Sequence, residues 1–172
     1  MYFIFIYSIY CQTCYLKILI IFAAWLLCCE LLLEKGWFIS MAKKNGAQSV
    51  ETIAGRKIVL SAGVGKTNVD ELKWLTETVL AEAKSWTSSG WAYIADCSQM
   101  SPVSPAEGGQ LVEMTRLFVD ANCKAFAFVE GNSLMLKIQA QKNTQRSETG
   151  VMEGHFATLD EALDWLKNDM KI

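Results

Sequence analysis

One apolar run, Trp91-Ala92-Tyr93-Ile94-Ala95, constrains the fold more than any other part of the sequence. A short continuous apolar run between turn-forming residues is typical of a strand that is buried on both faces, and such strands usually lie at the centre of a parallel sheet. Asp96 ends the run, and residues 97–103 are expected to form a polar loop. Because open α/β sheets place their sites where such loops leave the strand ends, we expect the functional site here.

Ser104 is predicted to begin a helix directly after this loop. Its side chain can accept a hydrogen bond from the amide of Glu107, Glu107 can reach back to the Ser104 amide, and Pro105 suits the first helical position. Gly108 and Gly109 follow in the first turn, where each costs about 1 kcal/mol of helix stability. This cost is explained either by close packing on the sheet or by a ligand that lies against the bare backbone.

The rest of the chain alternates strand patterns with helix patterns. Strands are expected at 50–53, 56–60, 124–129 and 151–156, and helices at 69–85, 104–122, 134–141 and from Thr158 onward. Residues 142–149 are polar and show no periodicity, so an irregular segment is expected there. This order predicts an α/β fold with a small, mostly parallel (mixed) sheet flanked by about four helices.

The first 40 residues differ from the rest because they form a hydrophobic segment with few charges. They are interpreted either as a membrane anchor or as the product of a mis-assigned start, since Met41-Ala42-Lys43-Lys44 resembles the beginning of a soluble protein. If the segment inserts into a membrane, the lysines that follow it keep the domain on the cytoplasmic side. Residues 41–49 are expected to be a linker, and residues 50–172 the folded domain.

Composition and spacing exclude several function classes. The formal net charge of −2 is not that of a nucleic-acid-binding surface, which is normally basic. Cys11 and Cys14 have zinc-like spacing, but no second cysteine pair follows at ligand spacing and the chain has a single histidine, His155. We therefore predict no metal and no cofactor, and a structural role for His155.

The segment Gly63-Val64-Gly65-Lys66-Thr67 resembles a phosphate-binding P-loop, and Asp96 could hold the magnesium ion of a nucleotide. Two features oppose this alternative. The first glycine of the motif is replaced by Leu60, and Asn68 is predicted to cap the next helix too late for Lys66 and Thr67 to present their amides to a phosphate. A small nucleotide-binding protein using Gly63, Gly65, Lys66 and Thr67 is thus the second hypothesis.

The closing residues carry a resemblance to a known family. The order of elements over Val50 to Lys167, with an ending built from Phe156, Glu161-Ala162 and Trp165-Leu166, resembles the STAS-like (SpoIIAA-like, anti-sigma-factor-antagonist) family. The resemblance implies a non-enzymatic regulatory module that docks a protein partner or a small ligand. In signalling members, a serine at the start of the helix after the central strand is phosphorylated. Ser104 has a comparable place, but Val103-Ser104-Pro105 does not match that motif, and capping alone also explains this serine.

We therefore expect a cytoplasmic interaction module without catalytic residues, tethered to the membrane only if residues 1–40 are translated. Its partner is expected to be a protein or a small apolar, lipid-like ligand rather than a nucleic acid. Asp96 has a second explanation, because an aspartate at a strand end commonly bonds the loop amides beyond it. The candidate site consists of Asp96, Ser98, Ser101, Ser104, Glu107, Gly108 and Gly109.

Overall fold

The structure is a computed structural model that describes residues 42–172. The predicted anchor or mis-assigned start at residues 1–40 lies outside the described residues. Between residues 42 and 172, none of the helices combines the length and the hydropathy that a membrane span requires. The fold described below is that of this part of the chain.

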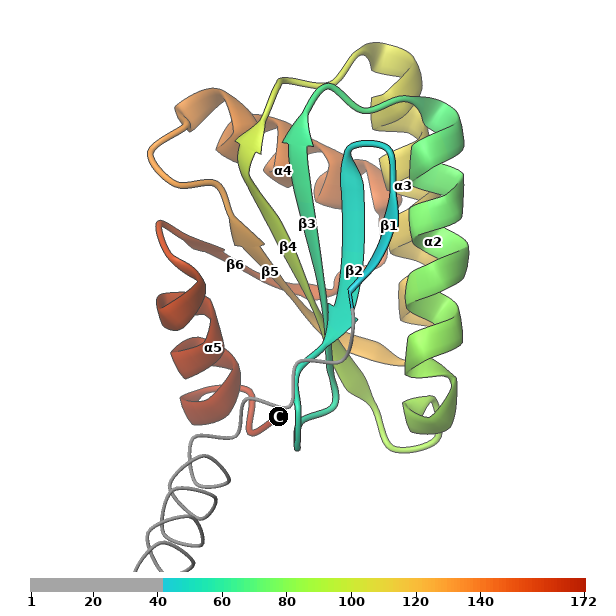
Figure 1. The fold of residues 1–172 in the computed structure, drawn as a ribbon. Helices are drawn as coiled ribbons and strands as arrows, with labels where there is room; N and C mark the ends of the chain where they lie inside the picture. Colours follow the sequence, from blue (N-terminus) through green and yellow to red (C-terminus); the bar gives the residue numbers. More distant parts are fainter. Residues whose placement is uncertain (1–41) are drawn as a thin grey trace, which may run out of the picture. The chain divides into compact units, whose positions relative to one another are not determined.

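Six strands form one mixed sheet, in which their spatial order follows their order in the sequence (Figure 1). The first three strands pair antiparallel, and β3 to β6 pair parallel, so the predicted mostly parallel, mixed sheet is confirmed. The strands are β1 (Lys43–Asn45), β2 (Gln48–Thr52), β3 (Ile58–Gly65), β4 (Trp91–Met100), β5 (Cys123–Val129) and β6 (Met152–Phe156).

Strand β4 lies between β3 and β5, as the apolar run predicted. Trp91, Tyr93 and Ile94 are each at most 1% exposed. The strand is longer than expected, however, because it continues to Met100. Strand β3 extends to Gly65, and after an irregularity near Gly63 it pairs with the end of β4. The expected loop at residues 97–103 therefore begins only after Met100, since β3 supplies partners for the backbone groups before it.

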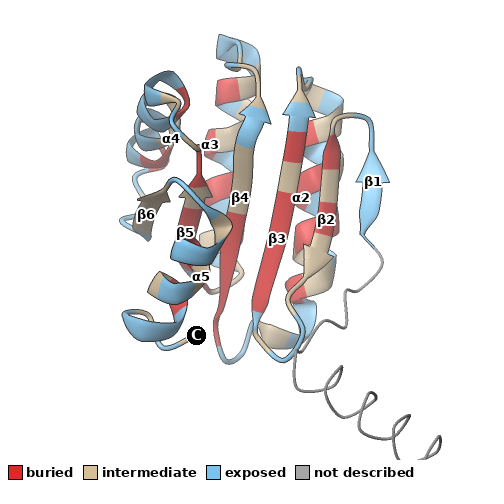
Figure 2. Cartoon of the chain, turned by 60° about the vertical axis from the view of Figure 1, so that its left-hand side comes forward, coloured by how far each residue is buried: buried red, intermediate tan, exposed pale blue. Residues whose placement is uncertain are grey.

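Four α-helices cover the sheet, three on one face and one on the other (Figures 1 and 2). One core joins α2 and α3 to the sheet through Val79, Tyr93 and Phe118, and a second core joins α5 to Ile94 and Ala127. Residues of one strand alternate between the two cores, because successive side chains of a strand point to opposite faces. The helices are α2 (Val69–Ala83), α3 (Pro105–Asp120), α4 (Leu134–Ser147) and α5 (Leu159–Asn168), and a 3-10 turn (η1, Lys84–Trp86) follows α2.

The predicted helix starts are confirmed by their capping contacts. The side chain of Asn68 accepts a hydrogen bond from the Glu71 amide at 2.9 Å, and that of Thr158 accepts one from the Glu161 amide at 3.3 Å. The Ser104 amide donates to the Glu107 carboxylate at 2.6 Å. Such contacts satisfy backbone groups that have no partner within the helix, so they place each start at a defined residue.

The segment at residues 42–48 does not form the expected linker. It contains β1, a turn at Gly46 with φ +55°, and the first residue of β2. The prediction was wrong because all three residues of β1 are exposed and so lack an apolar alternation. An ion pair of 2.7 Å between Lys43 Nζ and Glu82 Oε1 joins β1 to α2.

Helix α4 is also longer than predicted, since it runs to Ser147 rather than ending near residue 141. Its buried positions are Leu136, Thr144 and Ser147, so two of the three carry hydroxyl groups. A helix that buries small polar side chains shows no hydrophobic periodicity, which is why residues 142–149 were expected to be irregular. The helix ends at Glu148, which has a φ of 57°.

Candidate binding pocket

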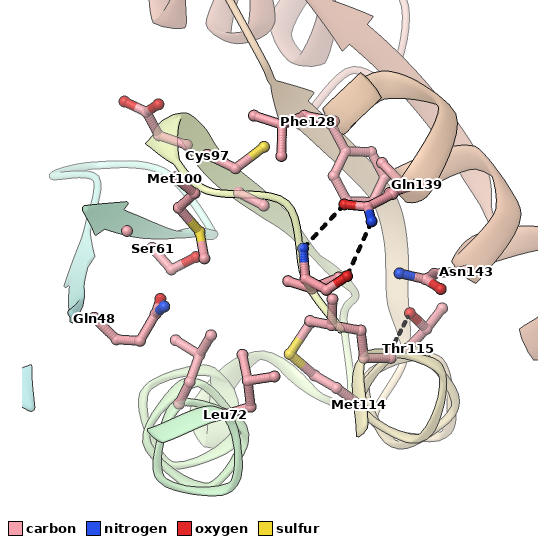
Figure 3. Close-up of a pocket in the computed structure, with 18 of the residues that line it drawn as sticks. Gln48, Ser61, Leu72, Cys97, Met100, Met114, Thr115, Phe128, Gln139 and Asn143 are labelled. Atoms are coloured by element: carbon pink, nitrogen blue, oxygen red, sulfur yellow. Dashed lines mark hydrogen bonds between the residues drawn. The ribbon is translucent and has the colours of Figure 1, made fainter. Parts of the chain in front are cut away.

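A cavity of about 90 Å³ lies between the sheet and helices α2, α3 and α4 (Figure 3). It is found near the carboxyl ends of β3, β4 and β5, where parallel sheets usually place their sites. Apolar side chains from four elements form much of its wall, namely Leu72 and Leu75 of α2, Met114 of α3, Phe128 of β5 and Leu136 of α4. The pocket is thus shaped chiefly to hold apolar groups.

Gly63 leaves the space in which two of the lining side chains lie. A Cβ atom at this position would stand 2.4 Å from Met100 Sδ and 3.2 Å from Gln48 Nε2. Figure 3 shows Gln48 and Met100 on the same side of the pocket. A side chain at residue 63 would therefore displace Met100 and press on Gln48.

The loop that follows β4 is attached to α4 by one side chain. Gln139 accepts a hydrogen bond from the Val103 amide at 3.1 Å and donates to the Val103 carbonyl at 3.0 Å (Figure 3). Both residues line the pocket. Gln139 therefore attaches the wall of the pocket to the loop that leads to Ser104.

Two buried hydroxyl groups meet in the wall of the pocket. Ser61 Oγ and Tyr93 Oη lie 2.5 Å apart, and the two residues are 4% and 1% exposed. Burial raises the pKa of Tyr93 far above its usual range, so the phenol stays neutral. Nearby, Thr115 Oγ1 donates to the Leu111 carbonyl at 2.9 Å. These hydroxyl groups have their hydrogen bonds within the protein.

Cys97 also lines the pocket, but its chemistry is that of a neutral thiol. Burial, and then the negative charges of Glu130 and Asp96, raise the pKa of Cys97 to about 12. The thiol donates a weak hydrogen bond to the Val129 carbonyl at 3.4 Å. A thiolate nucleophile needs a lowered pKa, so the surroundings of Cys97 do not activate it.

Two buried polar atoms of the pocket have no hydrogen-bond partner among the described residues. They are Nε2 of Gln48 and Oγ1 of Thr144. The two residues are 3% and 8% exposed, and both line the pocket. Buried polar groups without a partner are uncommon in native proteins, so each such group calls for an explanation.

The structure places only part of the predicted site at this pocket. Asp96 and Ser101 line it, whereas Ser98, Ser104, Glu107, Gly108 and Gly109 do not. Asp96 Oδ1 accepts hydrogen bonds from the amide and the hydroxyl group of Ser98, at 3.1 and 2.6 Å. Asp96 thus bonds a backbone amide just beyond it in the chain, which is the second explanation that the sequence offers for this residue.

The two glycines at the start of α3 differ in their surroundings. A Cβ atom at Gly108 would contact Asn143 of α4 at 3.5 Å, whereas one at Gly109 would meet nothing within 4 Å. Close packing thus describes Gly108, against a helix rather than the sheet, but it does not describe Gly109. Ser104 is exposed at the N-cap of α3, and its phosphorylation stays a prediction.

The structure does not support the P-loop alternative. Gly63 and Gly65 lie inside β3, and the Gly65 carbonyl accepts from the Ser101 amide at 2.7 Å. Lys66 and Thr67 precede α2, which is capped by Asn68. A P-loop wraps its backbone amides around a phosphate, whereas Gly63 to Gly65 here are residues of a paired strand. Among residues 42–172, no group of three His, Cys, Asp or Glu side chains could hold a metal ion.

Sequence reasoning missed most residues of the pocket. Gln48 falls in the stretch expected to be a linker, and Thr144 falls in the segment without periodicity. Leu72, Met114 and Phe128 carry only the signal of ordinary core residues. The sequence did not indicate the first residues of β2 or the second half of α4, which carry Gln48 and Thr144 to one cavity.

His155 forms a buried pair outside the pocket lining. Its Nδ1 atom lies 2.5 Å from Oε1 of Glu130, which is 3% exposed, and its ring stacks on Phe128 with 5.4 Å between ring centres. The pair links β6 to the end of β5. This geometry suits the structural role expected for His155, which stays a prediction.

Comparison with known proteins identifies the fold. No known family and no curated protein matches the sequence. An uncharacterized protein of the DUF3478 family from Shewanella loihica PV-4, described as having a SpoIIAA-like fold, superposes with a TM-score of 0.55 at 15% identity, covering 74% of this chain and 99% of that one. The protein TM1081, solved by NMR, gives 0.49 at 14% identity, covering 74% and 88%. The first of these superpositions shows that the chain has the SpoIIAA-like fold that its order of elements and closing residues indicated.

Proposed function

We propose that the protein is a non-enzymatic binding module of STAS type, and that it takes a small apolar ligand into the pocket beneath α2, α3 and α4. The observation that carries the proposal is the pocket itself, which opens near the strand ends between apolar side chains of both layers. Ligand sites in proteins are commonly of this kind, with an apolar wall and a few placed polar groups.

The size of the cavity limits the ligand. Its volume of about 90 Å³ is smaller than the roughly 150 Å³ of an engineered apolar cavity that binds benzene. The ligand is therefore a small ring or a short branched group, or one end of a longer molecule whose remainder leaves through the opening. Binding would act on the loop at Val103, because Gln139 holds that loop and also lines the pocket.

The polar groups of the pocket favour binding over catalysis. Cys97 and Tyr93 are held neutral, and Asp96 is bonded to Ser98. None of the hydrogen bonds among the lining residues joins a nucleophilic side chain to a side chain that could act as its base. A protein partner, which the family resemblance also implies, would instead contact the exposed residues Ser98, at the end of β4, and Ser104, at the N-cap of α3, and this remains a separate prediction.

Methionine methyl groups provide a direct test with the full chain. Met100 and Met114 line the pocket, whereas Met135 and Met152 are 59% and 56% exposed elsewhere. The chain is labelled with [methyl-13C]methionine and titrated with methylenecyclopentane, a small apolar probe. We expect saturable shifts of the Met100 and Met114 signals, with those of Met135 and Met152 unchanged.

Two variants test whether the shifts report on the pocket. Ala140 of α4 lines the cavity, so Ala140→Leu should fill it and weaken binding of the probe. Ala81→Leu is the matched control, because Ala81 is an exposed position of α2. If the Met100 and Met114 signals do not move, or if all four signals move alike, the pocket does not bind apolar molecules and the proposal fails.

A further inference from the structure

We infer that the pocket selects an uncharged ligand that carries a hydrogen-bond-accepting oxygen, and that Gln48 and Thr144 bind the polar atoms of this ligand. The inference rests on the proposed function, and it adds the chemical class of the ligand. The ligand is an apolar molecule with a ketone, ester, amide or ether oxygen. Gln48 is the donor to that oxygen, and Thr144 binds a second polar atom where the ligand has one.

Apart from Gln48 and Thr144, the fully buried polar side chains of the lining already have hydrogen bonds, whereas Ser101 and Asn143 are only partly buried. Ser61 and Tyr93 bond each other, Thr115 bonds Leu111, and Gln139 bonds Val103 twice. Among the described residues, the buried polar atoms of the pocket without a partner are those of Gln48 and Thr144. Two of the four buried side-chain atoms without a partner among the described residues thus lie at the pocket, and the other two, Oε2 of Glu153 and Nε2 of His155, belong to neighbouring side chains of β6.

The chemistry and the position of these two groups define what they can bind. Nε2 of Gln48 is a donor, so its missing partner is an acceptor, whereas the hydroxyl group of Thr144 can donate or accept. Gln48 reaches the pocket from β2 over Gly63, and Thr144 reaches it from α4. Figure 3 shows Gln48 on one side of the pocket and Asn143, the neighbour of Thr144, on the other. A ligand between them would be held at one or both ends.

The charges of the lining exclude an anionic ligand. No lysine, arginine or histidine lines the pocket, so a carboxylate or phosphate would find no cation to offset its desolvation. Asp96 lines the pocket and would repel an anion. Its Oδ1 atom is already bonded to Ser98, and the amide of Gln48 is the buried nitrogen donor of the lining that has no partner.

The decisive experiment compares two probes of nearly equal shape. Cyclopentanone carries a carbonyl oxygen where methylenecyclopentane carries a methylene group. Only the ketone can therefore accept a hydrogen bond from Gln48. Each is titrated into the full chain, and affinities are read from the Met100 and Met114 methyl signals. We expect the ketone to bind about three- to tenfold more tightly, which is the effect of one hydrogen bond.

Variants assign the preference to its donor. Gln48→Leu keeps the approximate size of the side chain but removes the amide, so it should abolish the preference while methylenecyclopentane still binds. Thr144→Val should leave the preference for this single-oxygen ketone in place, because the second polar atom is missing from the probe. Retention of the probe shifts in each variant shows that the pocket is still formed.

The possible results separate this inference from the proposed function. If neither probe binds to the natural chain, the proposed function itself fails. If both bind equally, the pocket is a site but ordered water satisfies Gln48, and the inference is overturned. A preference that survives in Gln48→Leu also overturns it, since another donor would then bind the oxygen.

Discussion

The hydroxyl pair of Ser61 and Tyr93 offers a sharp test of the packing around the pocket. The two oxygens lie 2.5 Å apart, and neither residue has another side-chain partner among the described residues. Replacing one partner leaves the other buried without a hydrogen bond. Tyr93→Phe and Ser61→Ala are therefore each expected to lower the free energy of unfolding by about 1–3 kcal/mol.

The double variant should lose less free energy of unfolding than the two single variants lose together. With both hydroxyl groups removed, no polar group is left without a partner, so the cost should be about 1 kcal/mol or less. The coupling free energy between the two sites is then at least about 1 kcal/mol, as expected for residues in direct contact.

Urea denaturation of the four proteins, followed by far-UV circular dichroism, measures this cycle. Equal slopes against urea concentration would show that the variants unfold from the same compact state. Additive losses, within about 0.5 kcal/mol, would refute the reasoning. In that case water from the pocket would satisfy the remaining hydroxyl group, and the wall would not be dry.

Three further predictions test other parts of the fold. Phe118 is fully buried and its ring lies 5.0 Å from that of Tyr93, so Phe118→Ala should lower the free energy of unfolding by about 3–5 kcal/mol in the same urea assay. Glu148 has a φ of 57° at the end of α4, so Glu148→Gly should raise the melting temperature through about 0.5–1 kcal/mol of relieved strain, and an unchanged or lower value would contradict this. The pKa of Cys97 is raised to about 12, so peptide-resolved alkylation at mildly alkaline pH should be about a thousandfold slower than in the urea-unfolded chain. Because the folded pKa is the higher one, the stability contributed by Cys97 is complete below the unfolded pKa of about 8.5 and is lost as pH rises toward 12.

Much of the fold could be predicted because its signals are local. The apolar run at Trp91–Ala95 correctly indicated the central parallel strand, and the residues at Asn68, Ser104 and Thr158 correctly indicated three helix starts. A buried strand has a recognisable apolar run, and a capping box has a fixed spacing, whatever the rest of the chain does.

The errors have a shared cause, which is tertiary context. Strand β1 is exposed on both faces, and α4 buries Thr144 and Ser147, so neither element carries the apolar pattern of its class. Gly63 and Gly65 resembled part of a nucleotide loop, yet Gly63 pairs with β2 and Gly65 pairs with β4, which makes both strand residues. Propensity and motif are weak evidence when neighbouring elements supply the hydrogen bonds.

The sequence by itself determined the alternation of strands and helices, the central position of β4 and the start of α3. Only the tertiary structure decided that Gln48 and Thr144 face the same cavity. Gln48 lies on β2 and Thr144 lies on α4, and these two elements are far apart in the sequence. The physical reason is that periodicity and capping depend on residues a few positions apart. A pocket depends instead on where the apolar faces of distant elements fail to fill the space between them.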